Sequence, residues 1–218
     1  MYKITCVNNF MRNDTKIMHP SPRRGRPPAY DRDAAIAALT RVFWDQGFAA
    51  TSLDDLASAT AMNRPSLYGA FGDKQAMYLA ALDRYGHDAE AQLGGLLAAV
   101  SDVRAAIAAL LHAGIEFYLA GDSGPRGCLA VCTAAAEALT TPAMRDGLAA
   151  VLAILDGVIA ARLAQGVADG QLPPDYDVAA AAMLIASALH SIAIRARAGS
   201  PRAELLRLAN AGATTLPG

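Results

Sequence analysis

The chain has 218 residues, of which 54% are hydrophobic but only 6% aromatic and 18% charged. About fifty residues are alanine, the strongest helix former, whereas the β-branched and aromatic residues that favour strands are sparse. This composition excludes an intrinsically disordered chain and argues against an all-β fold, and the length allows one domain or a small domain joined to a larger one.

The nearly neutral total of 19 Lys+Arg and 20 Asp+Glu residues hides an uneven distribution of charge. Six basic residues and one acidic residue give residues 1–30 a charge of +5, which leaves 13 basic and 19 acidic residues, or −6, for the remainder. A basic arm beside an acidic body is typical of a chain that presents one end to an anionic partner. For the arm alone, a solvated unstructured tail is an equally good interpretation.

The cysteine content and the apolar segments predict a soluble, cytoplasmic protein that does not enter a membrane. Three widely spaced cysteines do not form a disulfide framework, and no N-terminal segment has the pattern of a secretory signal. Residues 178–194 form the longest uncharged stretch, which is too short and too rich in alanine, and is interrupted by His190. Residues 1–17 differ in composition from the rest of the chain, so we expect them to be an upstream-start extension, with Met18 as the natural beginning.

Apolar periodicity, capping residues and glycine or proline breaks predict about nine helices and no confident strand, which is an all-α fold. Four prolines keep the arm of residues 1–30 extended, and Gly47 ends the apolar pattern that starts at Asp31. The predicted helices span residues 31–47, 53–59, 64–71, 73–94, 102–120, 128–139, 142–168, 178–198 and 201–211.

Two of these helices have the spacing of a helix-turn-helix. The short segments 53–59 and 64–71 are separated by Thr60 to Met62, and the second helix would enter a major groove. Leu56, Met62 and Leu67 fall at the apolar core positions of such a motif. An ordinary helical hairpin shares some of these features, so the pattern favours DNA binding without requiring it.

Residues 34–78 resemble the DNA-binding domain of the TetR (tetracycline-repressor) family of transcriptional regulators. The resemblance runs through the sequence Gly-Phe-Ala-Ala-Thr-Ser at 47–52, Leu56-Ala57, and Leu-Tyr-Gly-Ala-Phe-Gly-Asp-Lys at 67–74. It implies a three-helix DNA-binding domain over residues 31–78 and a helical ligand-binding and dimerisation domain over 79–218.

The resemblance implies specific DNA contacts. Thr51 or Ser52 would cap the first helix of the motif and donate to a phosphate, and Tyr68 and Lys74 would contact the phosphate backbone to set the register. Among the base-reading candidates, Arg64 is the most informative because a guanidinium can bind a guanine edge through two hydrogen bonds. Packing alone for Tyr68, and a solvated cap for Lys74, remain open. The predicted DNA-binding set is Arg23, Arg24, Arg26, Thr51, Ser52, Asn63, Arg64, Pro65, Ser66, Tyr68 and Lys74.

Three features near this motif affect how it would bind. Ala61 stands where the family usually has a glycine, so the turn would be strained if it needs a positive φ. Gly69 and Ala70 replace larger polar residues that often reach the DNA. The Arg-Arg-Gly-Arg-Pro-Pro arm at 23–28 resembles family arms that reach into the adjacent minor groove, where inserted arginines are attracted by the negative potential.

For the second domain the resemblance implies a homodimer formed through helices 178–198 and 201–211, which would read a palindromic DNA operator. It also implies a cavity for an unknown small-molecule effector. Polar or aromatic residues among apolar ones are the candidate lining, although ordinary packing is open for each: His112, Glu116, Phe117, Tyr118, Cys128, Cys132, Glu137, Met144 and His190.

Cys128 and Cys132 are four residues apart, on one face of the predicted helix 128–139. The dipole of that helix and the nearby Arg126 would lower the pKa of a thiol, which favours a thiol sensor. The alternative is that both cysteines are small buried hydrophobic residues. We expect no metal, no cofactor and no catalytic residues.

The most consistent function is a homodimeric repressor that is released from a palindromic operator by a small-molecule or thiol-reactive effector. A helical small-molecule-binding protein or enzyme using His112 and Glu116 is an alternative, as is an architectural DNA-binding protein without operator preference. Whether the ligand would act as inducer or co-repressor stays open.

Overall fold

The computed structural model describes residues 30–121, 124–214 and 216–217, and over these residues it contains helices and no strand. The all-α prediction is confirmed. The predicted arginines of the arm and the proposed 1–17 extension lie outside the described residues. The elements are α1 (Arg32–Ala50), α2 (Leu53–Thr60), α3 (Arg64–Phe71), α4 (Lys74–Ala98), α5 (Val103–Leu119), η2 (Ala130–Ala134), η3 (Glu137–Leu139), α6 (Pro142–Ala168), α7 (Val178–Arg197) and α8 (Arg202–Ala213).

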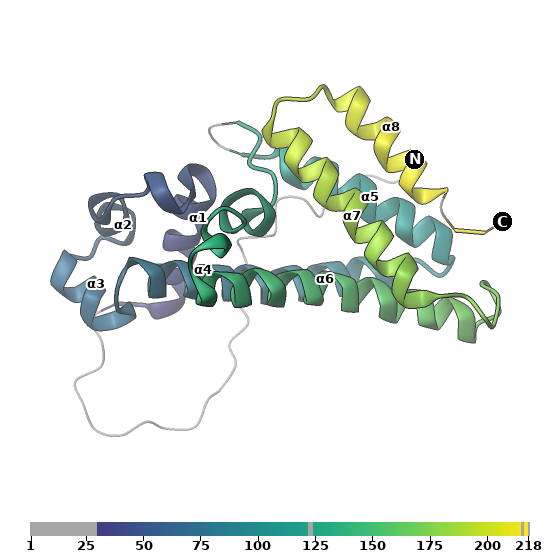
Figure 1. Ribbon diagram of the computed structural model, residues 1–218, viewed down its shortest axis with the longest axis horizontal. Coiled ribbons are helices and arrows are strands. Elements are labelled where there is room, and N and C mark those ends of the chain that lie inside the picture. Colours follow the sequence, from purple (N-terminus) through teal and green to yellow (C-terminus); the bar gives the residue numbers. More distant parts are fainter. Residues whose placement is uncertain (1–29, 122–123, 215, 218) are drawn as a thin grey trace, which may run out of the picture.

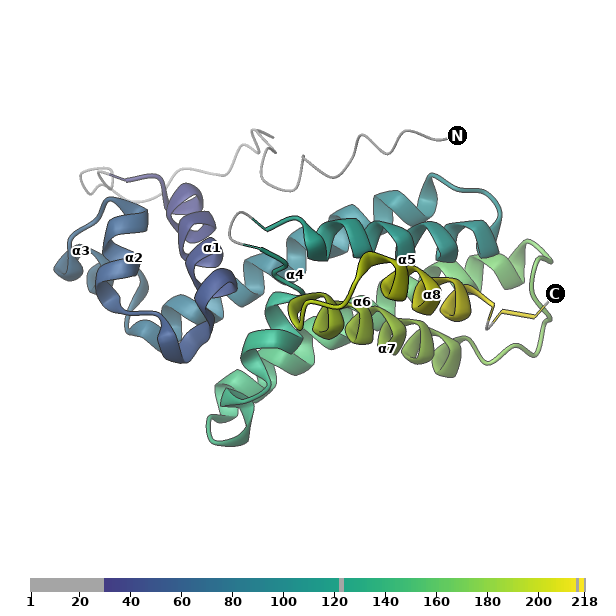
Figure 2. The ribbon, with the colours of Figure 1, turned by 90° about the horizontal axis from the view of Figure 1, so that it is seen from above.

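The molecule is elongated, with α1, α2 and α3 gathered at one end (Figure 1). From there α4 runs along the long axis beside α6, and α5, α7 and α8 form the other end of the body (Figure 2). The predicted boundary between residues 78 and 79 falls inside α4. The two predicted domains therefore share one continuous helix, which can carry a movement from one end to the other.

The helix starts follow the capping residues that the sequence contains. In each case a side-chain oxygen accepts a hydrogen bond from a backbone N–H in the first turn, which would otherwise lack a partner. The capping residues are Asp31, Ser52, Asn63, Asp73, Asp102 and Asp177. Gly47 breaks α1 as predicted, because its φ of 80° is left-handed, and three further residues complete α1 beyond the kink.

The predicted helix 128–139 is helical, but it is not a regular α-helix. Ala130–Ala134 forms a π-helical turn and Glu137–Leu139 a 3-10 turn, while Cys128 precedes both. The hydroxyl of Thr133 donates to the Leu129 carbonyl, which the Thr133 amide would bind in an α-helix, and this competition favours the wider turn. Thr133 in turn accepts from the Tyr78 hydroxyl at 2.6 Å, so that tertiary contacts with α4 hold the segment.

A buried arginine joins the two longest helices. Arg162 of α6 is 8% exposed and donates to the carbonyl oxygens of Leu97, Val100 and Ser101, at the carboxyl end of α4. Its positive charge also lies at the negative end of the α4 dipole. The end of α4 is thereby fixed against α6.

By length and hydropathy alone, α6 and α7 are apolar enough to cross a membrane, a test that the core helices of soluble proteins also pass. Here α6 packs against α4, and α7 packs against α5, α6 and α8. Both helices keep apolar residues on their outer faces, and Met183, Leu184 and Ile194 of α7 are more than half exposed.

Candidate nucleic-acid interface

The two helices of the predicted motif pack through one apolar face and leave the opposite face of α3 open. Leu56 and Leu67 are fully buried, and Met62 and Phe71 are nearly so. The other side of α3 forms the reading face, which we define as the exposed residues Asn63, Arg64, Pro65, Ser66 and Tyr68. It belongs to the end of the molecule where α3 lies, and its residues are exposed among those that the structure describes (Figure 1).

Local hydrogen bonds fix how α2 begins. Ser52 caps α2 in a reciprocal arrangement in which its hydroxyl accepts from the Asp55 amide while Asp55 accepts from the Ser52 amide and hydroxyl. Thr51 is buried, and its hydroxyl donates to the Gly47 carbonyl oxygen at 2.6 Å. Of the two predicted caps, the structure therefore selects Ser52, and it gives the Thr51 hydroxyl an internal partner in place of a phosphate.

The turn between α2 and α3 is strained in the way that the sequence suggested. Ala61 has φ 52° and ψ 28°, and among the residues described it is the only non-glycine residue with a positive φ. The Ala61 amide donates to the Ser58 carbonyl oxygen, and the Met62 amide donates to the Ala57 carbonyl oxygen. These two hydrogen bonds end α2. The left-handed conformation is thus required to redirect the chain into α3.

Arg64 is not free on the reading face. Its Nε donates to Oδ1 of Asp54 at 2.8 Å, and its Nη2 donates to Oδ2 at 2.6 Å. These hydrogen bonds and the attraction between the charges lower the pKa of Asp54 and raise that of Arg64. Sequence reasoning missed Asp54, because residues ten apart on two helices come together only through the geometry of the motif.

The remaining phosphate candidates differ in how firmly they are held. Tyr68 is 47% exposed, as a DNA contact requires. The Lys74 ammonium lies 3.5 Å from the Ala49 carbonyl oxygen and 4.6 Å from the centre of the Phe48 ring. The cation is thereby placed at the end of α1, beside the motif. Gly69, on the same side of α3, has open space around the position that a Cβ would take.

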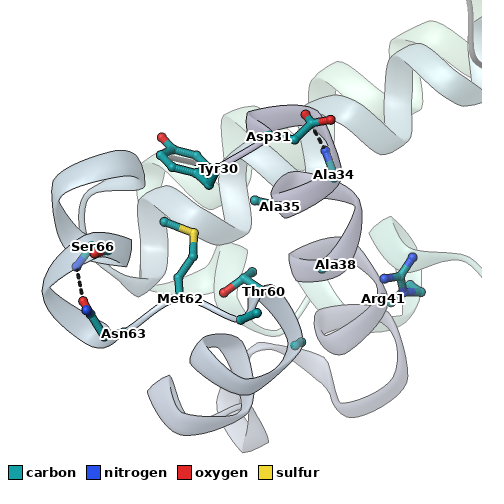
Figure 3. A pocket seen from close by; sticks show the side chains of 12 residues that line it. Tyr30, Asp31, Ala34, Ala35, Ala38, Arg41, Thr60, Met62, Asn63 and Ser66 are labelled. Atoms are coloured by element: carbon teal, nitrogen blue, oxygen red, sulfur yellow. Dashed lines mark hydrogen bonds between the residues drawn. The ribbon is translucent and has the colours of Figure 1, made fainter. Parts of the chain in front are cut away.

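A groove of about 590 Å³ runs between the start of α1 and the turn that joins α2 to α3. Figure 3 shows Tyr30 and Asp31 on its α1 side and Met62, Asn63 and Ser66 on its motif side. Since Asn63 and Ser66 also belong to the reading face, the groove borders the surface that would meet DNA.

The structure does not bring the predicted effector residues together in one cavity. His112 and Glu116 of α5 face α8, where His112 Nε2 lies 2.9 Å from Asn210 Oδ1 and Glu116 pairs with Arg202. His190 lines a shallow pocket on the outer side of α7, and partial burial lowers its pKa.

Met144 is buried in α6, and Glu137 lies in η3. In the part of the chain that is described, no three His, Cys, Asp or Glu side chains are grouped to hold a metal ion.

Phe117, Tyr118, Cys128 and Cys132 lie close to a contact between the two ends of the molecule. We define this contact, the α1–α7 junction, by Trp44, Tyr85, Gly127, Cys128 and Arg197. The Trp44 indole donates to the Gly127 carbonyl at 3.0 Å, and the Tyr85 hydroxyl donates to Cys128 Sγ at 3.2 Å. Phe117 packs on Trp44, with 5.2 Å between ring centroids.

Arg197, near the end of α7, closes the junction. Its Nη1 donates to the carbonyl oxygens of Trp44 at 3.0 Å and Arg126 at 2.8 Å. Gly127 has a φ of 66°, and a Cβ there would lie 2.6 Å from the Ala193 carbonyl oxygen of α7. The segment therefore passes tightly between α1 and α7. Neither Trp44 nor Arg197 was predicted, since each acts through backbone carbonyls far away in sequence.

The environment of the cysteines contradicts the prediction of a lowered pKa. Burial raises the pKa of Cys128, and partial burial raises that of Cys132. Cys128 directly precedes the helical segment, and hydrogen bonds from the amides of Ala130 and Val131 do lower its pKa, whereas Arg126 is directed toward Trp44 and Asp45. Desolvation of the thiolate outweighs the favourable hydrogen bonds.

Comparison with known proteins matches both parts of this architecture. Residues 35–81 match the family described as "Bacterial regulatory proteins, tetR family", and residues 104–211 match "Tetracyclin repressor-like, C-terminal domain". The HTH-type transcriptional repressor ComR of Escherichia coli (strain K12) is 30% identical over 192 residues, which cover 85% of this chain and 89% of ComR. The chain belongs to the TetR family.

A structure of the TetR-family regulator CifR, a cysteine mutant complexed with 26-bp double-strand operator DNA, matches with a TM-score of 0.77. CifR is 32% identical, and the match covers 88% of this chain and 100% of the CifR chain. The HTH-type transcriptional activator FasR of Mycolicibacterium smegmatis is 29% identical over 122 residues, or 55% of this chain and 56% of FasR. The TetR-family chain described here is a DNA-binding transcriptional regulator and not an enzyme.

Proposed function

We propose that this regulator is a cytoplasmic homodimeric repressor that binds a palindromic operator and is released by a small-molecule or thiol-reactive effector. The observation that carries the proposal is the reading face of α3, which is polar, exposed and supported from behind by Leu67 and Phe71. A helix held in this way can enter a major groove without rearrangement. In this scheme residues 31–78 bind DNA, and residues 79–218 dimerise and bind the effector.

The DNA contacts divide into two classes. Tyr68 and Lys74, with the exposed start of α2 at Ser52, contact phosphates and set the register. Arg64, Pro65 and Ser66 meet base edges in the major groove, while Arg23, Arg24 and Arg26 of the arm enter the adjacent minor groove.

The outer face of α7 supports the homodimer. Met183, Leu184 and Ile194 are 61%, 55% and 52% exposed, and they share this face with Ser187. Large apolar side chains gathered on one helix are typical of a surface that a partner covers. A twofold axis beside α7 and α8 would place two copies of α3 on two half-sites of one operator.

Changing Met183 to glutamate tests the dimer. A charge at the centre of an apolar interface opposes association, so we expect the variant to sediment as a monomer while the wild type sediments as a dimer. Leu139 is 81% exposed in η3, away from α7, and Leu139→Glu is the matched control that should remain dimeric. A Met183→Glu protein that is as dimeric as the wild type would place the interface elsewhere.

The α1–α7 junction supports the proposed site of effector action. It joins the helix that supports the DNA-binding motif to the helix that we assign to the dimer interface, and it contains Cys128 with Cys132 nearby. A ligand or modification that separates Trp44 from Gly127 would change the spacing of the two reading faces. ComR is a repressor and FasR an activator, and we assign repression because the relation to ComR extends over more of the chain.

A DNase footprint of the full-length protein on DNA flanking its own gene tests the proposal as a whole. We expect one protected segment with two inverted half-sites spaced by the helical repeat, and a loss of protection when a thiol-reactive probe such as iodoacetamide is added. A single asymmetric site would contradict the dimer. Uniform weak protection would contradict operator recognition, and protection that persists with the probe would remove the thiol-reactive effector.

A further inference from the structure

Asp54 and Arg64 form a two-point contact that fixes the orientation of the guanidinium as well as neutralising its charge. Asp54 lies in the first turn of α2 and Arg64 is the first residue of α3, so the pair bridges the two helices of the motif. The two hydrogen bonds, at 2.8 Å and 2.6 Å, are parallel and occupy the side of the guanidinium that carries Nε and Nη2. The Arg64 side chain is 54% exposed and that of Asp54 is 73% exposed, so the pair lies on the surface that would meet DNA.

The opposite edge of the guanidinium stays available. A guanidinium has five N–H groups, and Asp54 accepts two of them, which leaves both protons of Nη1 and one of Nη2. No other acceptor for Arg64 is found in the part of the chain that the structure describes. The Nη1–Nη2 edge is an edge that can donate to both O6 and N7 of a guanine.

Holding the Nη1–Nη2 edge of Arg64 in place before DNA binds affects how well the protein distinguishes guanine from other bases. An exposed arginine without a partner samples many rotamers, and it can move to a phosphate when the base is not guanine. Because Asp54 repels phosphate and holds the guanidinium through two atoms, that alternative becomes less favourable. The paired charges also add little general attraction to DNA, so the contribution of Arg64 shifts from affinity toward the identity of the base.

We propose that Asp54 is a specificity-determining residue, which holds the Arg64 guanidinium side-on so that its free edge reads a guanine in the operator. The inference depends on the proposed reading of bases by α3. It assigns Asp54 the role of a positioning residue, because the carboxylate acts through Arg64 and not through its own contact with a base.

The experiment compares full-length wild type with Asp54→Ala, Asp54→Asn and Arg64→Ala. Each protein selects from a library of randomised double-stranded DNA, and Kd is then measured for the selected duplex and for its single-base variants. Asp33→Ala removes one exposed acid from the first turn of α1 and is the control for net charge. Since Ser52 and Asp55 cap α2 without Asp54, we expect the variants to fold, which circular dichroism verifies.

We expect Arg64→Ala and Asp54→Ala to lose preference for guanine at the same position of each half-site. For Asp54→Ala the discrimination should fall about tenfold, while its affinity for unrelated DNA is unchanged or higher. Asp54→Asn keeps one acceptor and should be intermediate, and Asp33→Ala should keep full discrimination. Combining Asp54→Ala with Arg64→Ala should cause no further loss.

Two outcomes would overturn the inference while leaving DNA reading by α3 intact. In the first, Arg64→Ala loses the guanine preference but Asp54→Ala keeps it or sharpens it, so that the carboxylate only competes with DNA. In the second, Asp54→Ala changes affinity for all duplexes by the same factor. If Arg64→Ala itself alters no base preference, the reading of bases by Arg64 fails as well, and with it the premise of the inference.

Discussion

Ala61 has a strained backbone conformation at the turn between the two helices of the motif. A left-handed backbone costs an alanine about 1–2 kcal/mol, and a glycine has no such penalty. At φ 52° and ψ 28° the residue ends α2 and starts the turn to α3. The free-energy cost of this conformation therefore comes with the turn that sets the direction of α3. The sequence indicated this strain on the condition that the turn needs a positive φ, because an alanine stands where the family usually has a glycine.

Replacing Ala61 with glycine should therefore stabilise the protein. We expect the free energy of unfolding to rise by about 1 kcal/mol, and Tm by about 2–4 °C for a chain of this length. Thermal unfolding followed by circular dichroism measures the change. Ala59, exposed inside α2, is the control, and its replacement by glycine should lower stability by about 0.5–1 kcal/mol. A destabilised Ala61→Gly protein would show that the turn is not strained.

The two cysteines should differ in reactivity from an ordinary thiol. Burial raises the pKa of both, so the thiolate that reacts is scarce at pH 7 and increases only as pH rises through the elevated pKa. We expect iodoacetamide to label Cys132 before Cys128, because Cys132 is the more exposed. Peptide mass spectrometry over pH 6–10 follows each site, and protein unfolded in urea is the reference. Faster labelling of Cys128 at pH 7 would contradict this order.

At the scale of the element, the sequence predicted helices where the cause is local and failed where it is tertiary. Capping by Ser52 and Asn63 and the break at Gly47 depend on neighbouring residues, and these starts and stops were predicted correctly. The type of helix in the segment 128–139 was not predicted, because Thr133 and its partner Tyr78 on α4 determine its form.

The same distinction applies to the candidate sites. The residues of the reading face could be predicted because they are close together along one helix. The pairing of Arg64 with Asp54 could not, because it depends on how two helices pack. The effector candidates were chosen by residue type alone. They are dispersed over α5, α6, α7 and the segment between α5 and α6.

Arg162 provides a test of how α4 and α6 are joined. Replacing it with methionine keeps the apolar stem but removes the donors to three carbonyl oxygens at the end of α4. A buried acceptor left without a donor costs about 1–3 kcal/mol, and we expect a loss of that order in urea unfolding. Arg145→Met on the exposed face of the same helix should change stability by less than about 0.5 kcal/mol. If Arg162→Met and Arg145→Met changed the free energy of unfolding equally, Arg162 would not stabilise the contact between α4 and α6.

For the whole molecule, the α1–α7 junction connects α1, which supports the DNA-binding motif, with α7, which carries the exposed apolar face. Arg197 binds carbonyls on both α1 and the segment before η2, so it holds together parts that are 71 and 153 residues away in sequence. Coupling between distant sites requires an element with two arrangements, and the hydrogen bonds of Arg197 are the contacts of the junction that a movement of α7 would change.

Arg197→Gln should loosen this junction without unfolding either end. We expect faster amide hydrogen exchange in residues 124–136 and in the second half of α1, with exchange in α5 unchanged. Arg195→Gln is the control, because Arg195 pairs with Glu204 on the surface. Uniform exchange changes along the chain would indicate general destabilisation and contradict a local role.

The open position at Gly69 has a consequence for how such regulators diverge. A Cβ introduced there would meet no atom from another part of the described structure within 4 Å, on an exposed part of α3. A polar residue can therefore be gained at this position without a clash at its Cβ, and it would lie beside the residues that we propose contact bases. After gene duplication, one codon change could give a copy of this protein a different operator, while its fold, its partner surface and its response to ligand were inherited unchanged.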